Sequence, residues 1–167
     1  GIMRYRHTTR AEMVKEFQKV RDNPEPKAVF FTCMDSRMIP PDLRNLTLLF
    51  QSYCLIFFFT LSDTHVGDMF VIRNAGNLVP HSQFFQDENY SCEPAGLELG
   101  CVVNDIRHII VCGHSDCKAM NLLLQLQDAE FASRHNRIIS PLRAWLCTHA
   151  GTSLQKYLHL IENGKNV

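Results

Sequence analysis

The chain has 167 residues, of which 46% are hydrophobic, so it is long enough to bury one sizeable core. One domain over residues 1–167 is therefore the default expectation. Its 17 Lys and Arg residues balance 17 Asp and Glu residues, and this balance argues against nucleic acid or a membrane surface as a partner. The seven cysteines are scattered and odd in number, which favours reduced thiols in an intracellular protein over a disulfide framework. The first residues show no signal-peptide pattern.

Helical and strand patterns alternate along the chain. Apolar residues at positions 13, 17 and 20 recur at the spacing of one helix face, and prolines end this helix at positions 24 and 26. Apolar runs predict buried strands at 28–32, 68–73 and 108–112, and helical patterns cover 93–103 and 117–127. Strands that alternate with helices indicate an α/β fold, a single domain with a mainly parallel β-sheet flanked by helices.

Two helices are expected at the end of the chain. Ser140 and Pro141 are suited to the N-cap and the first turn of one helix, and Gly151 is predicted to close it. Residues 152–155 have the capping-box pattern, so a last helix is expected to begin there and to end near Gly164.

Residues 42–62 break this regular pattern. They are strongly apolar but follow neither the helical nor the strand period, and Gln51 and Ser52 interrupt them. The apolar run is shorter than the roughly 20 residues of a membrane-spanning helix, so a buried strand or helix is preferred to a membrane anchor. We also hypothesise that this atypical insertion is not selected protein sequence but is translated from a retained intron or stems from a gene-model error.

Two short motifs follow predicted strands. Residues 33–37 (CMDSR) come directly after the strand at 28–32, and residues 114–117 (HSDC) come soon after the strand at 108–112. In an open parallel sheet, ligands bind just beyond the carboxyl ends of such strands. We therefore expect the two motifs to meet at one edge of the sheet.

The residue types in these motifs predict a metal site. Two thiolates, one imidazole and one carboxylate form a zinc ligand set, here Cys33, Cys117, His114 and Asp35. The fourth ligand is either Asp35, which closes the site, or water, which zinc makes acidic near neutral pH. Arg37 is placed to hold the Asp35 carboxylate away from the metal as a bidentate ion pair.

Each of these residues also has an ordinary interpretation. A cysteine at a strand end is usually a core residue, and an Asp-x-Arg pair is usually a surface ion pair. A zinc-binding but catalytically impaired fragment of an enzyme, or a structural-zinc or thiol protein, therefore remains the alternative to an active enzyme. The chain has no Cys-x-x-Cys pair, which weighs against a dithiol redox centre. None of the remaining histidines is singled out as a proton shuttle.

Three motifs together resemble the β-class carbonic anhydrases, and in particular their animal, insect-like members: residues 33–37 (CMDSR), 73–77 (RNAGN) and 111–117 (VCGHSDC). The resemblance implies a zinc lyase (carbonate dehydratase), in which a zinc-bound hydroxide reversibly hydrates carbon dioxide to bicarbonate and a proton. It implies that Cys33, His114 and Cys117 bind one zinc ion. It also implies that Asp35 and Arg37 form the catalytic pair and that Gly113 takes part in substrate binding.

The resemblance also implies a parallel-sheet α/β domain that forms a homodimer or a higher homo-oligomer, in the cytoplasm or the mitochondrion. The chain differs from the family pattern in two respects. The connection over residues 41–63 is longer and more apolar than the family's, and His65 stands near the place of a groove glutamine that many members carry. Family members also generally continue into a further strand and helix, so we expect a C-terminally truncated member.

Overall fold

The computed structural model describes residues 6–7, 10–38, 66–85 and 91–164. Its helices and strands are, in chain order, α2 (Arg10–Asp22), β1 (Ala28–Cys33), β2 (Met69–Asn74), α4 (Cys92–Leu97), β3 (Ile109–Cys112), α5 (Lys118–Gln125), α6 (Arg134–Ile139) and α7 (Pro141–Glu162). A π-helical segment, Glu98–Val103, continues α4. The atypical insertion at 42–62, and with it the retained-intron hypothesis, lies outside the described residues.

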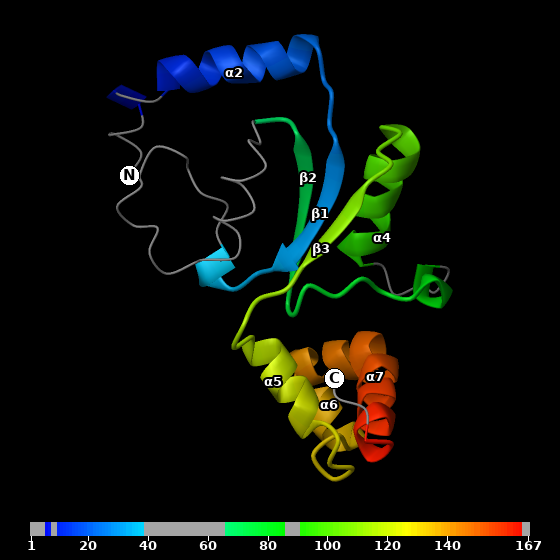
Figure 1. The fold of residues 1–167 in the computed structure, drawn as a ribbon. Helices are drawn as coiled ribbons and strands as arrows, with labels where there is room; N and C mark the ends of the chain where they lie inside the picture. The colour runs from blue at the N-terminus through cyan, green and yellow to red at the C-terminus, as the bar shows by residue number, and fades with distance from the viewer. Residues whose placement is uncertain (1–5, 8–9, 39–65, 86–90, 165–167) are drawn as a thin grey trace.

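The three strands form a parallel sheet in the order β2-β1-β3, with β1 in the centre (Figure 1). Every residue of β1 is buried, as expected for the central strand of a parallel sheet. Cys33 pairs with Asn74 of β2, and Thr32 pairs with Cys112 of β3. The carboxyl ends of all three strands therefore meet at one edge, and the predicted fold class, α/β with a mainly parallel sheet flanked by helices, is confirmed.

One face of the sheet packs closely against α4 and its π-helical continuation. Val29 and Phe31 of β1 point into this layer and are fully buried. A Cβ atom built at Gly100 would lie 2.4 Å from Cγ2 of Val29, and one at Gly96 would lie 2.5 Å from Cδ1 of Ile72. Because glycine has no Cβ atom, the helix backbone can rest directly on β1 and β2.

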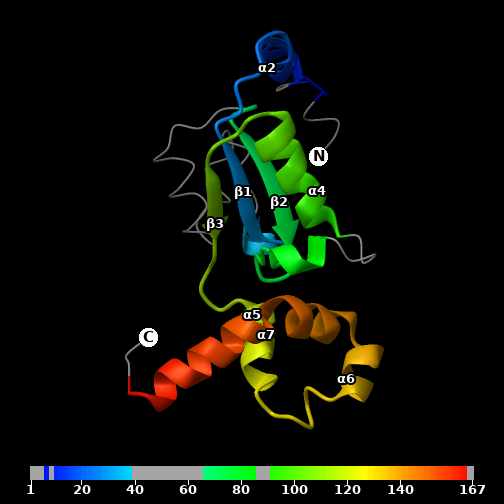
Figure 2. The same ribbon diagram turned by 90° about the vertical axis from the view of Figure 1, so that its right-hand side faces the viewer.

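Helices α5, α6 and α7 lie beyond the carboxyl ends of the strands, as both views show (Figures 1 and 2). Phe30, on the opposite face of β1 from Val29, joins the apolar cluster that includes these helices. Leu123 of α5 and Leu146 and Leu154 of α7 are buried in the same cluster. This helical layer therefore packs next to the edge of the sheet where the two sequence motifs meet.

The prediction of two helices at the end of the chain is wrong. Ser140 does cap α7 by accepting a hydrogen bond from the Arg143 amide, but the helix continues through Gly151 to Glu162. The capping-box pattern at 152–155 therefore lies inside a helix. The buried residues Leu146, Ala150 and Leu154 recur every four positions, and burial of this continuous stripe outweighs the propensity cost of one helical glycine, which is about 1 kcal/mol.

Helix α2 ends before Pro24, as its sequence predicts, yet none of its residues is buried. Within the described ranges, every helix is too short or too polar to cross a lipid bilayer. Helix α6 was not predicted, because its six residues carry no apolar stripe of helical period.

Candidate metal centre

The first motif forms a tight turn directly after β1. Cys33 is the last residue of the strand and is 4% exposed. Ser36–Met38 form a single 3-10 turn, in which the Met38 amide donates to the Asp35 carbonyl oxygen. The Arg37 amide donates to the Asp35 carboxylate at 2.9 Å. The strand thus delivers the Cys33 thiol into the core, while the turn that follows folds Asp35 and Arg37 together.

The second motif connects β3 to α5. Asp116 has φ of +52°, in the left-handed region that Asp tolerates better than most residues, and this bend brings Cys117 to the start of α5. Cys117 is 4% exposed. Burial raises the pKa of the Cys117 thiol, against the opposing effect of the Met120 and Ala119 peptide N–H groups. A bound cation would reverse this preference, because it stabilises the thiolate.

The two motifs bring three metal-binding side chains together. The Sγ atoms of Cys33 and Cys117 are 3.8 Å apart. Together with one ring nitrogen of His114, the potential ligand atoms all lie within 4.8 Å of one another. The sequence-predicted residues Cys33, His114 and Cys117 therefore converge in a site able to bind a metal ion.

The hydrogen bonds of His114 fit metal binding. Its Nδ1 atom lies 3.0 Å from the Ser115 carbonyl oxygen, and a carbonyl can only accept, so Nδ1 carries the proton. Its Nε2 atom is buried and has no hydrogen-bond partner among the described residues. One neutral imidazole and two cysteine thiolates form a donor set that zinc prefers, and the unpartnered Nε2 atom is free to serve in it.

Asp35 is held by Arg37 in a bidentate pair. Arg37 Nε donates to Oδ1 at 3.0 Å, and Nη2 donates to Oδ2 at 2.9 Å. Arg37 Nη2 also donates to the Asp116 carbonyl oxygen at 2.9 Å, which links the first motif to the second. The Arg37 hydrogen bonds hold the pKa of the Asp35 carboxyl well below its usual range. The Asp35 carboxylate is not among the atoms of the Cys-His-Cys cluster, so its role as the fourth ligand stays a prediction.

The end of β2 supports the first motif from the side. The Asn74 carbonyl oxygen accepts a hydrogen bond from the Met34 amide at 2.9 Å, and the guanidinium of Arg73 reaches the carbonyls of Cys33 and Asp35. Sequence reasoning gave Arg73 no role of its own. Its signal was its place at the carboxyl end of a strand, where polar side chains approach the neighbouring strand end.

A buried amide organises the turn after β2. The Asn74 side chain donates to the Leu78 carbonyl oxygen at 2.8 Å and to the Glu93 carboxylate at 2.9 Å, and it accepts from the Leu78 amide at 2.8 Å. Glu93, at the start of α4, is only 6% exposed. Trp145 of α7 donates from its indole nitrogen to the Ala75 carbonyl oxygen at 3.0 Å. The turn is thus tied to both α4 and α7, and sequence reasoning missed these ties.

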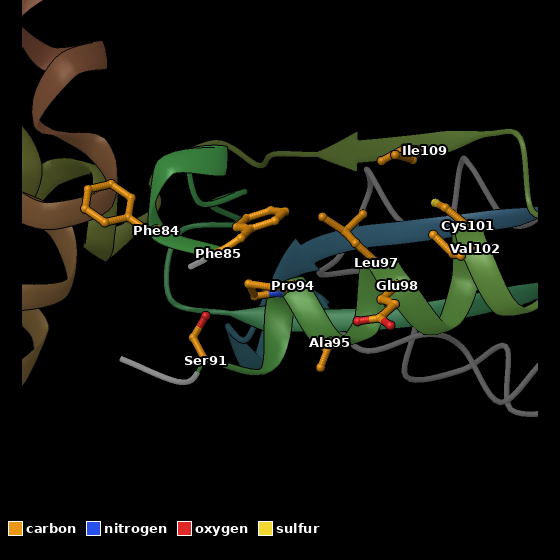
Figure 3. Close-up of a pocket in the computed structure, with 10 residues that line it drawn as sticks. All are labelled: Phe84, Phe85, Ser91, Pro94, Ala95, Leu97, Glu98, Cys101, Val102 and Ile109. Atoms are coloured by element: carbon orange, nitrogen blue, oxygen red, sulfur yellow. The ribbon is translucent and has the colours of Figure 1, made fainter. Parts of the chain in front are cut away.

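A separate hollow of about 530 Å³ lies between α4 and β3 (Figure 3). Its lining is mostly apolar, and it includes none of the three clustered metal-binding residues: Phe84, Phe85, Ser91, Pro94, Ala95, Leu97, Glu98, Cys101, Val102 and Ile109. Several apolar side chains around it are exposed, among them Val102 at 75% and Ile109 at 51%. The hollow is therefore separate from the Cys-His-Cys cluster.

A parallel sheet whose carboxyl edge carries a Cys-His-Cys donor set defines an α/β protein with a metal-binding centre. The sequence profile of the family described as carbonic anhydrase matches residues 58–163. The matched range includes the second motif but leaves the first motif outside. The solved structure of the β-carbonic anhydrase CcaA is similar with a TM-score of 0.69 at 27% identity, and the match covers 98% of this chain and 60% of that chain.

Two nematode proteins are also similar. Beta carbonic anhydrase 1 of Caenorhabditis elegans is 36% identical over 167 residues, which cover 98% of this chain and 54% of the relative. Beta carbonic anhydrase 1 of Caenorhabditis briggsae is 39% identical over 159 residues, which cover 93% of this chain and 51% of the relative. The chain belongs to the carbonic anhydrase family, in its β class. It spans about half the length of the curated relatives it matches.

Proposed function

We propose that the chain is a zinc-dependent carbonic anhydrase, which reversibly hydrates carbon dioxide to bicarbonate and a proton. The observation that carries the proposal is the convergence of three ligand atoms from Cys33, His114 and Cys117 within 4.8 Å of one another. The unpartnered, buried Nε2 atom of His114 supports a metal there, because a buried polar nitrogen without a partner is costly. Membership of the carbonic anhydrase family supports the reaction.

Cys33, His114 and Cys117 would hold one zinc ion per chain. When bound, zinc supplies a Lewis acid that makes a water molecule acidic near neutral pH. The Ser115 carbonyl fixes the tautomer of His114, so that Nε2 presents its lone pair to the centre. Two thiolates and one neutral imidazole leave a fourth position for Asp35 or for water.

In this proposal Asp35 and Arg37 act as the catalytic pair. Because Arg37 keeps Asp35 ionised, the carboxylate can accept a hydrogen bond from a reacting water and orient it. The bidentate hydrogen bonds from Arg37 also favour a position of the Asp35 carboxylate away from the three proposed zinc ligands.

Gly113 is proposed to line the substrate side. It lies between the end of β3 and His114. Among the described residues other than its chain neighbours, the atoms within 4 Å of a Cβ atom built there are those of the Asn77 side chain, at 3.9 Å. A small molecule such as carbon dioxide could therefore approach the backbone beside His114.

The proposed assembly is a homodimer or a higher homo-oligomer, because exposed apolar side chains surround the hollow between α4 and β3. The proposed location is intracellular, in the cytoplasm or the mitochondrion. Six cysteines within the described ranges are free, which fits a reducing compartment.

Stopped-flow carbon dioxide hydration by the purified, zinc-loaded chain tests the proposal. We expect about one zinc per chain and a hydration rate above the buffer rate, with both lost in Cys33→Ser and Cys117→Ser. Cys92→Ser, which changes an exposed cysteine, should match the wild type. One zinc per chain without hydration would favour the catalytically impaired fragment. No zinc at all would favour the thiol protein.

A further inference from the structure

Arg73 makes an unusual set of contacts for an exposed residue. It is the last residue but one of β2, where its backbone is in register with Thr32 of β1. Its guanidinium bends across the end of β1. Nε and Nη2 each lie 3.2 Å from the Cys33 carbonyl oxygen, and Nη2 lies 2.9 Å from the Asp35 carbonyl oxygen. One side chain thus binds two carbonyls that flank Met34.

These carbonyls belong to the backbone that directs two site residues. The Cys33 side chain enters the metal-binding cluster, and the Asp35 side chain pairs with Arg37. The Met34 amide, between them, donates to the Asn74 carbonyl oxygen at 2.9 Å. The backbone over residues 33–35 is therefore held by β2 at both carbonyls and at the amide that separates them. A rotation of this backbone would redirect both the thiol and the carboxylate.

Arg73 acts here through directed hydrogen bonds to backbone carbonyls rather than through an ion pair. In the part of the chain that the structure describes, no carboxylate lies within ion-pair distance of Arg73. The planar guanidinium offers several N–H groups in fixed directions, which suits two carbonyls at once. A lysine keeps the positive charge but offers a single ammonium group, so it cannot reproduce this fork.

We infer that Arg73 is a positioning residue of the metal centre: by holding the carbonyls of Cys33 and Asp35, it sets the directions of the thiolate and of the carboxylate. The inference rests on the proposed function in that the metal is zinc. Groups that orient metal ligands typically change metal affinity by 10- to 100-fold when they are removed. We therefore expect removal of the Arg73 side chain to weaken zinc binding and to change the geometry of the metal centre, and not only to lower the stability of the fold.

The experiment compares Arg73→Met with Arg73→Lys in the full chain. The matched controls are Arg107→Met and Arg107→Lys, because Arg107 is an exposed arginine whose ion pair is with Asp105. Circular dichroism first establishes that each variant is folded. Zinc affinity is then measured by competition with a chromophoric chelator, and the cobalt-substituted proteins are compared by their thiolate-to-cobalt charge-transfer and ligand-field spectra.

We expect Arg73→Met to bind zinc about 10- to 100-fold more weakly than the wild type and to show altered cobalt bands. Arg73→Lys should recover only part of the affinity, and both Arg107 variants should match the wild type. A merely structural role would lower the unfolding midpoint but leave the cobalt spectrum of the folded protein unchanged.

Wild-type zinc affinity and a wild-type cobalt spectrum in folded Arg73→Met would overturn the inference alone. If Arg73→Met does not fold, Arg73→Lys decides: equality with Arg107→Lys in both measurements would overturn the inference. If the wild-type chain itself binds no zinc, the proposed function fails, and the inference fails with it.

Discussion

The Sγ atoms of Cys33 and Cys117 lie 3.8 Å apart, although 84 positions separate the two residues in the chain. The parallel register brings them together, because it places the end of β3 beside the end of β1. Two thiolates at this distance repel each other, so the deprotonated pair requires a cation between or beside them. The protein thus builds a site in which a metal ion and the local fold stabilise each other.

Removing the Asp35–Arg37 pair should separate zinc binding from turnover. In Asp35→Asn and Arg37→Ala we expect zinc content close to the wild type, because neither residue belongs to the Cys-His-Cys cluster. Hydration of carbon dioxide should fall about 10- to 100-fold, the usual cost of losing a group that orients a metal site. Zinc analysis and stopped-flow rates on the same samples check this. A fully active Arg37→Ala would contradict the role given to the pair.

The buried carboxylate of Glu93 should stabilise the fold through Asn74. In Glu93→Ala the Asn74 amide loses an acceptor in a site with little access to water, and we expect a loss of about 1–3 kcal/mol in the free energy of unfolding. Glu98→Ala is the control, since Glu98 is an exposed acidic residue that follows the same helix. Urea unfolding monitored by circular dichroism compares the two. Equal effects would show that the Asn74–Glu93 bond contributes nothing of its own.

Two helical glycines should respond in opposite ways to alanine. Apart from the neighbouring turns of its own helix, no atom of the described residues lies within 4 Å of a Cβ built at Gly151, so Gly151→Ala should stabilise the protein by about 0.5–1 kcal/mol through helix propensity. At Gly100 the Cβ would lie 2.4 Å from Cγ2 of the fully buried Val29, so Gly100→Ala should destabilise it by about 1–3 kcal/mol. Thermal unfolding of both variants measures the signs. If Gly100→Ala were more stable than the wild type, this would contradict the close packing of the π-helical segment Glu98–Val103 on the sheet.

His149 should make the fold sensitive to mild acid. Its ring packs against Trp145 and Phe84, its Nδ1 atom is buried without a partner among the described residues, and burial lowers the pKa of the imidazole. The unfolded chain, with a histidine pKa of about 6.5, then takes up the proton first. Stability is therefore lost as pH falls through about 6.5 towards the lower pKa of the folded state.

The variant His149→Phe keeps an aromatic ring in place and removes this titration. The fall in unfolding free energy between about pH 7 and pH 5 should be smaller in this variant than in the wild type. His159→Phe, at an exposed position of the same helix, should retain the full fall. An unchanged pH profile in His149→Phe would exclude His149 as a source of the acid sensitivity.

The sheet was predictable from sequence because its strands are short apolar runs. The run at 28–32 matches β1 within one residue, since a strand buried on both faces needs apolar side chains at nearly every position. That α7 is one continuous helix, and not two, could not be predicted from the sequence. Gly151 and the capping pattern are local signals for a break, whereas the buried stripe that overrides them depends on packing against α5.

The candidate site, too, has a part that the sequence could predict and a part that it could not. Cys33, His114 and Cys117 could be grouped beforehand because each follows a predicted strand, and strand ends of a parallel sheet share an edge. The hold of Arg73 on two carbonyls could not be foreseen. It depends on the register between β1 and β2 and on a side-chain conformation, and neither is encoded in local spacing.

X-ray absorption spectroscopy of the zinc-loaded chain tests the central claim most directly, because it counts the atoms bound to the metal. The account predicts two sulfur ligands at about 2.3 Å, with nitrogen or oxygen ligands at about 2.0–2.2 Å completing four-coordination. In Cys117→Ser zinc should be lost, and any zinc that remains should have at most one sulfur ligand. A zinc ion with only nitrogen and oxygen ligands in the wild type, or with two sulfur ligands still present in Cys117→Ser, would contradict a metal centre built from Cys33, His114 and Cys117.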